Sequence, residues 1–186
     1  MTYEQVLNGA QDRMDKALKH TQDQLRNIRT SRASAGLVEN IRVEYYGTPT
    51  PLNQLAQIST PEPRQIVIKP YDAQSLEDIG KAIMKSDLGL NPATAGDVIR
   101  IPMPPLTEET RRTFIKQAKH EAESARVSVR NARRDANSML KELLKDKEIS
   151  EDEERRAQEE IQKLTDRFVA QVEKQLAEKE ADLLEI

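Results

Sequence analysis

The chain has 186 residues, of which 37% are hydrophobic and 33% charged, and its net charge of −3 argues against indiscriminate nucleic-acid binding. It contains no cysteine, which excludes disulfides, thiol catalysis and thiolate metal sites. No stretch approaches the roughly 20 apolar residues that span a membrane, and residues 1–19 mix acids and bases without an apolar run. We therefore expect a soluble cytoplasmic protein without a signal peptide and with no membrane partner.

The first predicted element is a helix from Thr2 to about Arg29. Thr2 and Gln5 have the spacing of a capping box. Behind them, mostly apolar residues recur at steps of three and four, which predicts one buried helix face. This stripe consists of Val6, Ala10, Met14, Ala17, Thr21, Leu25 and Ile28.

Residues 31–105 hold all nine prolines and five of the six glycines, and the helical period disappears there. A helix is predicted from about Ser75 to Lys85, and a turn from Gly47 to Pro51. Short runs with β character predict three strands at 41–46, 65–69 and 98–101. This part of the chain is therefore expected to form a small β-rich domain of β/α/β type.

Residues 114–143 predict a long amphipathic helix with a stripe rich in alanine, which allows close approach of neighbouring helices. Residues 111–134 contain eight basic and two acidic residues, a local balance of +6. The predicted stripe consists of Ile115, Ala118, Ala122, Ala125, Val129, Ala132, Ala136, Met139 and Leu143. At about 100° per residue, seven cations fall on one flank of it: Arg112, Lys116, Lys119, Arg126, Arg130, Arg133 and Arg134. Such a row suits a phosphate backbone, although a solvated helix face is the alternative.

A third helix is predicted after Ser150, which forms a capping box with Glu153. Its apolar stripe consists of Ala157, Ile161, Leu164, Phe168, Val172, Leu176 and Leu183. Three amphipathic helices can bury one another's stripes, so we expect a three-helix bundle. Residues 145–160 carry four cations against eight acids, a local balance of −4 that contrasts with the basic segment before it.

The order of elements inserts the small domain between the first and second bundle helices. The expected domains are residues 1–30 with 106–186 for the bundle and residues 31–105 for the insertion. Two short segments then join the domains, and we expect them to act as a hinge. Its residues are Thr30, Ser31, Arg32, Pro102, Pro104 and Pro105. Firm packing of the two domains is the alternative.

The sequence predicts no catalytic residue, metal site or cofactor, so an enzyme is not expected. His120 and Glu121 begin like a zinc-protease helix, but Ser124 stands where the second histidine would be needed. No glycine-rich nucleotide fingerprint is present. His20 and His120 lie on charged helices and are interpreted as surface residues.

Several motifs resemble the bacterial ribosome recycling factor family. They are Glu44-Tyr-Tyr-Gly-Thr-Pro-Thr-Pro-Leu52, Ser86-Asp-Leu-Gly-Leu-Asn-Pro92, Pro104-Pro-Leu-Thr-Glu-Glu109, Val129-Arg-Asn-Ala-Arg-Arg-Asp-Ala-Asn137 and Leu144-Lys-Asp-Lys-Glu-Ile-Ser150. The resemblance runs from about residue 28 to the C-terminus. It implies an α+β fold, in which a long three-helix bundle and a small inserted β-rich domain form an L.

The resemblance also implies a function. Members bind the ribosome after termination and, with elongation factor G and GTP, separate its subunits without hydrolysing anything themselves. It implies large-subunit ribosomal RNA and elongation factor G as partners of a monomer. Candidate RNA-binding residues are Arg130, Arg133, Arg134, Arg126, Lys119, Arg29 and Arg32. The family commonly has glycine where this chain has Ser31, which reduces backbone freedom at the hinge.

Two other functions remain open from the residues alone. An oligomeric coiled-coil scaffold would explain the heptads, and an RNA chaperone unrelated to ribosomes would use the same basic helix. Tyr45 and Tyr46 are candidates for stacking on bases, but strand alternation places them on opposite faces, so at least one is expected in the core.

Overall fold

The computed structural model describes residues 1–185, and the chain divides into two compact units. Unit 1 contains residues 1–28 and 112–181, and unit 2 contains residues 29–111 together with the end of the chain from residue 182. The fold class is α+β, with long helices and a small sheet domain, as the sequence predicted. In the part of the chain that is described, no helix is long and apolar enough to cross a membrane.

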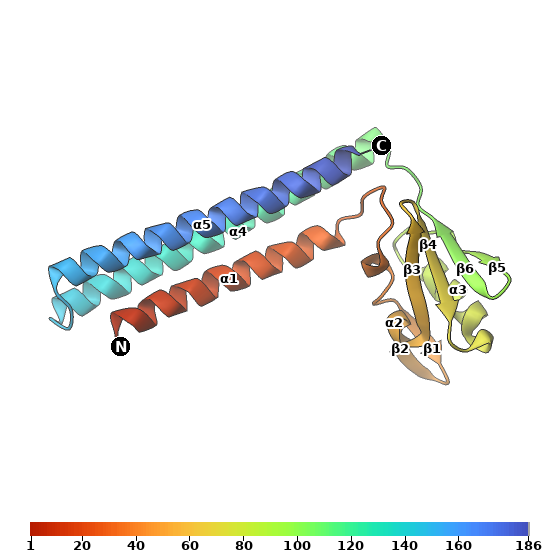
Figure 1. Ribbon diagram of the computed structural model, residues 1–186, viewed down its shortest axis with the longest axis horizontal. Helices are drawn as coiled ribbons and strands as arrows, with labels where there is room; N and C mark the ends of the chain where they lie inside the picture. Colours follow the sequence, from red (N-terminus) through yellow and green to blue (C-terminus); the bar gives the residue numbers. More distant parts are fainter. Residues whose placement is uncertain (186) are drawn as a thin grey trace. The chain divides into compact units, whose positions relative to one another are not determined.

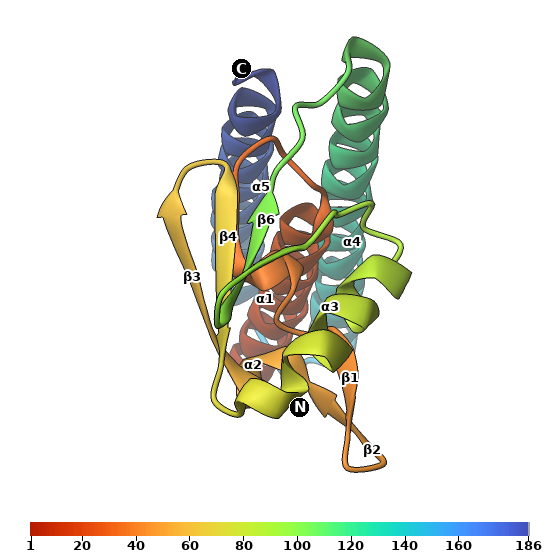
Figure 2. The same cartoon turned by 90° about the vertical axis from the view of Figure 1, so that its right-hand side faces the viewer.

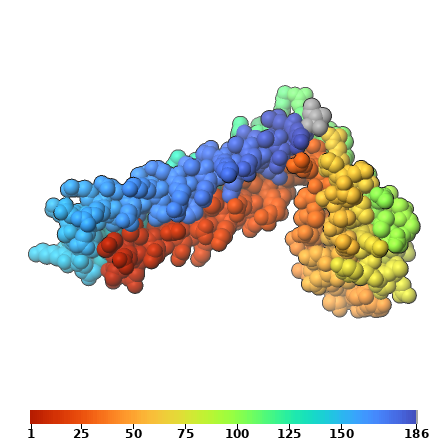
Figure 3. Space-filling model, viewed as in Figure 1, coloured from red at the N-terminus to blue at the C-terminus, as the bar shows by residue number. Residues whose placement is uncertain are grey.

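Three long helices build unit 1. They are α1 (Tyr3–Asn27), most of α4 (Glu108–Lys145) and most of α5 (Glu151–Leu184), and they run side by side (Figure 1). The predicted capping box of α1 is confirmed, because the Gln5 N–H donates to the Thr2 hydroxyl (3.2 Å) and the Thr2 N–H donates to the Gln5 side chain (3.0 Å). The space-filling view shows α1 and α5 packed without a gap along most of α1 (Figure 3).

The core of unit 1 follows the predicted stripes with one-residue shifts on all three helices. On α1, Ala17 was predicted to be buried and is only partly buried, whereas the adjacent Leu18 is buried. On α5, Leu164 was predicted to be buried and is only partly buried, whereas the adjacent Thr165 is buried.

On α4, the predicted Ile115 is also only partly buried. Met139 was predicted to be buried and is 41% exposed, whereas Leu140 is fully buried. A stripe of seven-residue repeats drifts by about 20° per heptad on a helix with 3.6 residues per turn, so the buried position moves by one residue over this length. The buried residues of α4 are Ala118, Ala122, Ala125, Val129, Ala132, Ala136, Leu140 and Leu143.

The connection from α4 to α5 is a tight turn with local hydrogen bonds. Lys147 adopts φ 59°, and the N–H groups of Lys147 and Glu148 donate to the carbonyls of Leu144 (3.0 Å) and Leu143 (2.9 Å). This is the Schellman arrangement that ends many helices. The predicted capping box of α5 is confirmed by hydrogen bonds between Ser150 and Glu153 in both directions.

Unit 2 contains two antiparallel sheets. One pairs β1 (Arg42–Tyr45) with β2 (Thr48–Pro51), and the other has the order β3-β4-β6-β5. Its strands are β3 (Ala56–Glu62), β4 (Gln65–Pro70), β5 (Ala93–Ala95) and β6 (Val98–Pro102). The remaining elements are α3 (Leu76–Lys85) and short helices η1 (Ala35–Leu37), α2 (Leu52–Leu55) and η2 (Ala73–Ser75). Figure 2 shows α3 lying beside β1.

The core of unit 2 is made mainly of branched aliphatic residues from the strands, α2, α3 and the segment after η1. Its fully buried members include Val38, Leu52, Ile66, Ile68, Ile79, Ile83, Ile99 and Ile101. Of the predicted elements, the helix at 75–85 and the three predicted strands match α3, β1, β4 and β6. The turn predicted from Gly47 to Pro51 is wrong, because Tyr46 and Gly47 make the turn and Thr48–Pro51 is β2. Its prolines are tolerated because β2 pairs with only one strand.

Candidate nucleic-acid interface and connecting segments

The seven predicted cations of α4, from Arg112 to Arg134, are here called the basic face, and all belong to unit 1. Most of them are exposed, with Arg126 and Arg133 partly buried. This difference in exposure follows from the helix geometry, because Arg126 and Arg133 lie nearest to the buried alanine stripe. The basic face therefore presents most of its charge to water.

Arg126 differs from its neighbours because its guanidinium is occupied by two carboxylates. Nε donates to Glu173 of α5 (2.5 Å) and Nη1 donates to Glu123 (2.6 Å), and the side chain is only 16% exposed. The hydrogen bond with Glu173 raises the pKa of Arg126 above its ordinary value and, in the same way, lowers the pKa of Glu173. Arg126 therefore joins α4 to α5, and its charge is largely offset.

Four other members of the basic face, Lys119, Arg130, Arg133 and Arg134, are less engaged by acidic groups in the described structure. Arg130 lies 4.0 Å from Glu123, at the limit of an ion pair, and is about half exposed. Within residues 1–185, no ion pair engages Lys119, Arg133 or Arg134. Their donors are free for an external anion, and guanidinium groups suit phosphate because each can donate two parallel hydrogen bonds.

Arg29 and Arg32 belong to unit 2 and have different surroundings. Arg29 is half-buried, its Nη2 donates to the Pro104 carbonyl (2.9 Å), and burial lowers its pKa. Its Nε is buried without a hydrogen-bond partner among the described atoms. Arg32 is exposed and its backbone N–H donates to the Thr30 hydroxyl (3.2 Å). Of the two, Arg32 has the more accessible charge.

The two predicted hinge segments are both hydrogen-bonded to the turn between β3 and β4. The Ala33 N–H donates to the Pro63 carbonyl (2.6 Å), and the Met103 N–H donates to the neighbouring Arg64 carbonyl (2.7 Å). Together with the bond from Arg29 to Pro104, these contacts attach residues 29–33 and 103–104 to unit 2. Pro102 ends β6, and Pro104 and Pro105 are exposed.

Ser31 is buried, with 6% of its surface exposed, and its hydroxyl donates to the Glu185 carbonyl (3.1 Å). Among the non-glycine residues described, positive φ occurs at Tyr46 and Lys147 alone, so Ser31 has a backbone conformation that any residue can adopt. Neither this contact nor the one between Arg126 and Glu173 could be predicted from sequence spacing, since the partners are distant along the chain.

The family model and the similar proteins all carry the same family description. A family model described as ribosome recycling factor matches residues 21–184. Proteins named ribosome-recycling factor from Marinomonas sp. (strain MWYL1) and Legionella pneumophila (strain Paris) are 53% and 54% identical over 182 residues, covering 98% of both chains in each comparison. The counterpart from Alcanivorax borkumensis is 55% identical over 181 residues, covering 97% of this chain and 98% of the relative.

Two solved structures are also similar. The solution structure of a ribosome recycling factor has a TM-score of 0.80 and 44% identity, covering 99% of this chain and 98% of its own. A second structure describes models for the T. thermophilus ribosome recycling factor and E. coli elongation factor G bound to the E. coli post-termination complex. Its matching chain has a TM-score of 0.70 and 42% identity, with complete coverage of both chains.

Proposed function

This chain belongs to the ribosome recycling factor family, and we propose that it binds the post-termination ribosome and, with elongation factor G and GTP, promotes dissociation into subunits. The observation that carries this function is identity above 50% over nearly the whole chain with proteins named for it. A relative bound with elongation factor G to a post-termination complex supports the same partners. In this proposal the chain acts in the cytoplasm as a monomer and contributes binding, not catalysis.

The basic face is the proposed contact with large-subunit ribosomal RNA. This role is supported for the exposed Lys119 and Arg134 and the partly buried Arg133, which have no ion pair among the described residues, and for Arg130, whose only ion pair there is at the 4.0 Å limit. Arg126 would contribute by holding α4 against α5, which orients the face. Arg32 is proposed as a second contact, and Arg29 as a residue that mainly fixes its own connecting segment.

The connecting segments are proposed to act as a hinge between the bundle and the inserted domain of residues 31–105. Residues 29–33 and 103–104 are hydrogen-bonded within unit 2, so we place the points of bending just outside them, near residue 28 and along residues 105–107. The prolines at 104 and 105 stiffen the second segment, which favours transmission of force over free rotation.

Charge reversal at Arg133 tests the RNA contact. Arg133→Glu should weaken binding to isolated large subunits roughly tenfold or more, because a charge-assisted hydrogen bond is replaced by repulsion. The slope of log affinity against log salt should fall by about one, as expected for loss of one phosphate contact. Sedimentation of the protein with large subunits at several salt concentrations measures both quantities.

The matched control is Arg155→Glu, which reverses an exposed cation at the acidic start of α5. It should leave binding unchanged. Because Arg133 has no ion pair among the described residues, its variant should also keep the wild-type melting temperature. Wild-type binding by Arg133→Glu, or an equal loss in the control, would contradict the proposed contact.

The recycling function itself is tested by a sucrose-gradient profile of post-termination ribosomes. The protein, elongation factor G and GTP are mixed with them and then omitted one at a time. Subunits should separate only with all three present. Intact ribosomes in the complete mixture would refute the proposal, and tight binding to free RNA without large subunits would favour an RNA chaperone. A mass that rises with concentration in light scattering would favour the scaffold.

A further inference from the structure

Unit 2 has a small surface hollow that the proposed RNA contact and hinge do not use. It has a volume of about 150 Å³ and lies between the tip of the β1–β2 hairpin and the start of α3. Two tyrosines and two aspartates dominate its lining, which comprises Tyr45, Tyr46, Asp72, Gln74, Ser75 and Asp78. Aromatic rings beside carboxylates are the chemistry that recognises organic cations.

The two tyrosines on the aromatic side of the hollow contact each other. Tyr46 is 79% exposed and adopts φ 49° in the hairpin turn. Its ring meets Tyr45 edge to face, with ring centres 4.6 Å apart. Tyr45 is half-buried and its hydroxyl donates to Asp72 (3.3 Å). The exposed ring therefore has a fixed neighbour, so contact with a ligand would lose little rotational freedom.

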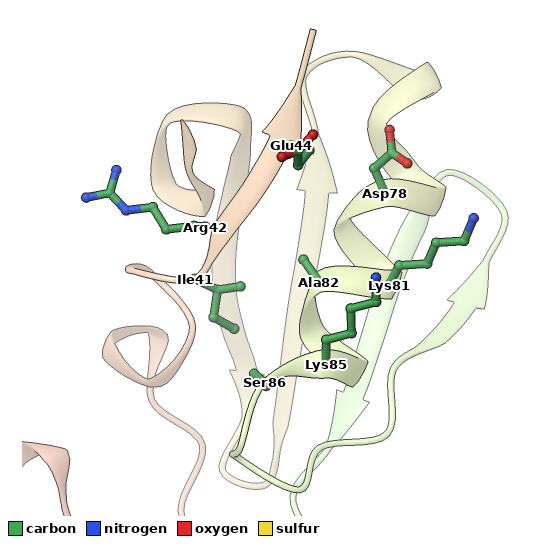
Figure 4. Close-up of a pocket in the computed structure, with 8 residues that line it drawn as sticks. All are labelled: Ile41, Arg42, Glu44, Asp78, Lys81, Ala82, Lys85 and Ser86. Carbon is green, nitrogen blue, oxygen red and sulfur yellow. The ribbon is translucent and has the colours of Figure 1, made fainter. Parts of the chain in front are cut away.

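Among the described residues no ion pair neutralises the acidic side of the hollow, although the pKa of Lys81 is raised by its hydrogen bond and attraction to Glu77 and, after these, by attraction to Asp78. Asp72 accepts hydrogen bonds from Tyr45 and from the Gln74 N–H (3.0 Å), both uncharged donors. In the described part of the chain, no ion pair engages Asp78. Lys81, one turn further along α3, is paired with Glu77 (3.0 Å). Figure 4 shows Lys81 extending away from Glu44 and Asp78, which lie on opposite sides of an adjoining groove.

We propose that this hollow is a docking point for an arginine side chain of a protein partner. A planar guanidinium can stack its face on Tyr46 while the N–H groups in its plane donate to the aspartates, whereas an ammonium ion has no planar face to stack on the ring. Nucleic acid is disfavoured within the hollow itself, because Asp72 and Asp78 would repel its phosphates. The adjoining groove between β1 and α3 carries Arg42, Lys81 and Lys85 beside Glu44 and Asp78, so it gives a neutral or acidic continuation of the partner's segment room to lie (Figure 4). This inference does not depend on the ribosomal function.

Nuclear magnetic resonance on the full chain tests the proposal with a short probe peptide, Gly-Ser-Arg-Ser-Gly. Its titration should shift the backbone signals of residues 45–46 and 72–78, with saturation in the millimolar range. The same peptide with citrulline in place of arginine, which is neutral but similar in shape, should give no saturable shift. Spermidine should bind more weakly than the arginine peptide.

Variants identify the groups responsible. Tyr46→Ala and Asp78→Asn should each weaken the peptide about two- to fivefold, the loss expected for one exposed cation–π or charged contact. Tyr71→Ala is the matched control, because Tyr71 is 72% exposed but does not line the hollow. Unchanged signals elsewhere in unit 2 establish that each variant is folded.

Four results would overturn the inference. Equal shifts with the citrulline peptide would show that charge is not recognised, and equal affinity for spermidine would reduce the site to diffuse attraction of cations. Binding of a short oligouridine to the same residues would assign the hollow to nucleic acid instead. Wild-type affinity in Tyr46→Ala and Asp78→Asn would also refute it.

Discussion

Arg126 shows how acidic neighbours decide whether a basic residue binds within the protein or remains available to a partner. It lies on the same helix face as Arg130 and Arg133, yet Glu173 and Glu123 take its guanidinium and leave it 16% exposed. Such a residue stabilises the contact between two helices, and its loss would disturb the proposed RNA contact indirectly. Its neighbours keep their donors for an external anion.

Removing the carboxylate of Glu173 should change the pH dependence of stability. The hydrogen bond with Arg126 lowers the pKa of Glu173 below its ordinary value of 4.5. The pair therefore stabilises the fold fully above about pH 4.5, and this contribution is lost as the pH falls through the lowered pKa. Glu173→Gln should lower the free energy of unfolding by up to about 1 kcal/mol at pH 7, because Glu173 is half exposed.

Urea unfolding at pH 7 and at pH 3 measures this difference, which should shrink at the lower pH. Glu178→Gln is the control, because Glu178 is exposed and carries no ion pair in the described structure. A variant that is equally destabilised at both pH values would show that packing, not charge, explains the effect.

The spacing of residues correctly predicted that these cations share one face of α4. It did not reveal which of them would form ion pairs within the protein. Angular position on a helix follows from the spacing of residues alone. The partner of Arg126 lies 47 residues away, and its position depends on the packing of α5 against α4. The same limit hid the contact between Ser31 and Glu185, which are 154 residues apart.

At the scale of elements, long helices were predicted more completely than short strands. The 38 residues of α4 repeat their apolar period about ten times, so a one-residue drift at Met139 does not obscure the helix. By contrast, β5 has three small exposed residues and no alternation. Likewise β3 contains Pro61 and an irregular register after Ser59, and β2 is half proline. Their pairing partners, rather than their own composition, make them strands.

The alanine stripe of α4 should not tolerate larger side chains. Ala125 is 2% exposed within the bundle. Ala125→Leu inserts three extra carbons into this contact and should destabilise the protein by about 1–3 kcal/mol, since close-packed helices must separate or strain to admit them.

Denaturant unfolding of Ala125→Leu is best compared with Ser128→Leu, which adds a leucine at an exposed position on the same helix. The control should lie within about 0.5 kcal/mol of wild type. If both variants were equally stable, close packing along the alanine stripe would not be what holds α4 in the bundle.

At the scale of the whole molecule, the net charge of −3 conceals two surfaces of opposite sign. The basic face belongs to unit 1, and the hollow lined by Asp72 and Asp78 belongs to unit 2. A polyanion and a cationic protein segment can therefore be bound by different units of one chain. This separation suits a factor whose proposed partners are ribosomal RNA and a protein.

The proposed hinge predicts that RNA binding and ribosome splitting can be separated. Pro104→Gly with Pro105→Gly removes the stiffness of one connecting segment while leaving the basic face intact. The double variant should bind isolated large subunits with wild-type affinity but split post-termination ribosomes more slowly in the sucrose-gradient assay. Its stability should fall by about 0.4–1 kcal/mol per proline, because the unfolded chain gains freedom.

The control exchanges two other exposed prolines, Pro49→Gly with Pro61→Gly, at a similar expected loss of stability. Because these residues lie in β2 and β3, outside the connecting segments, the control should split ribosomes at the wild-type rate. If both variants split ribosomes slowly, the loss of stability explains the defect. If Pro104→Gly with Pro105→Gly splits ribosomes at the wild-type rate, this segment does not transmit force. Slow splitting by that variant alone, with binding unchanged, would place the mechanical step in the second connecting segment.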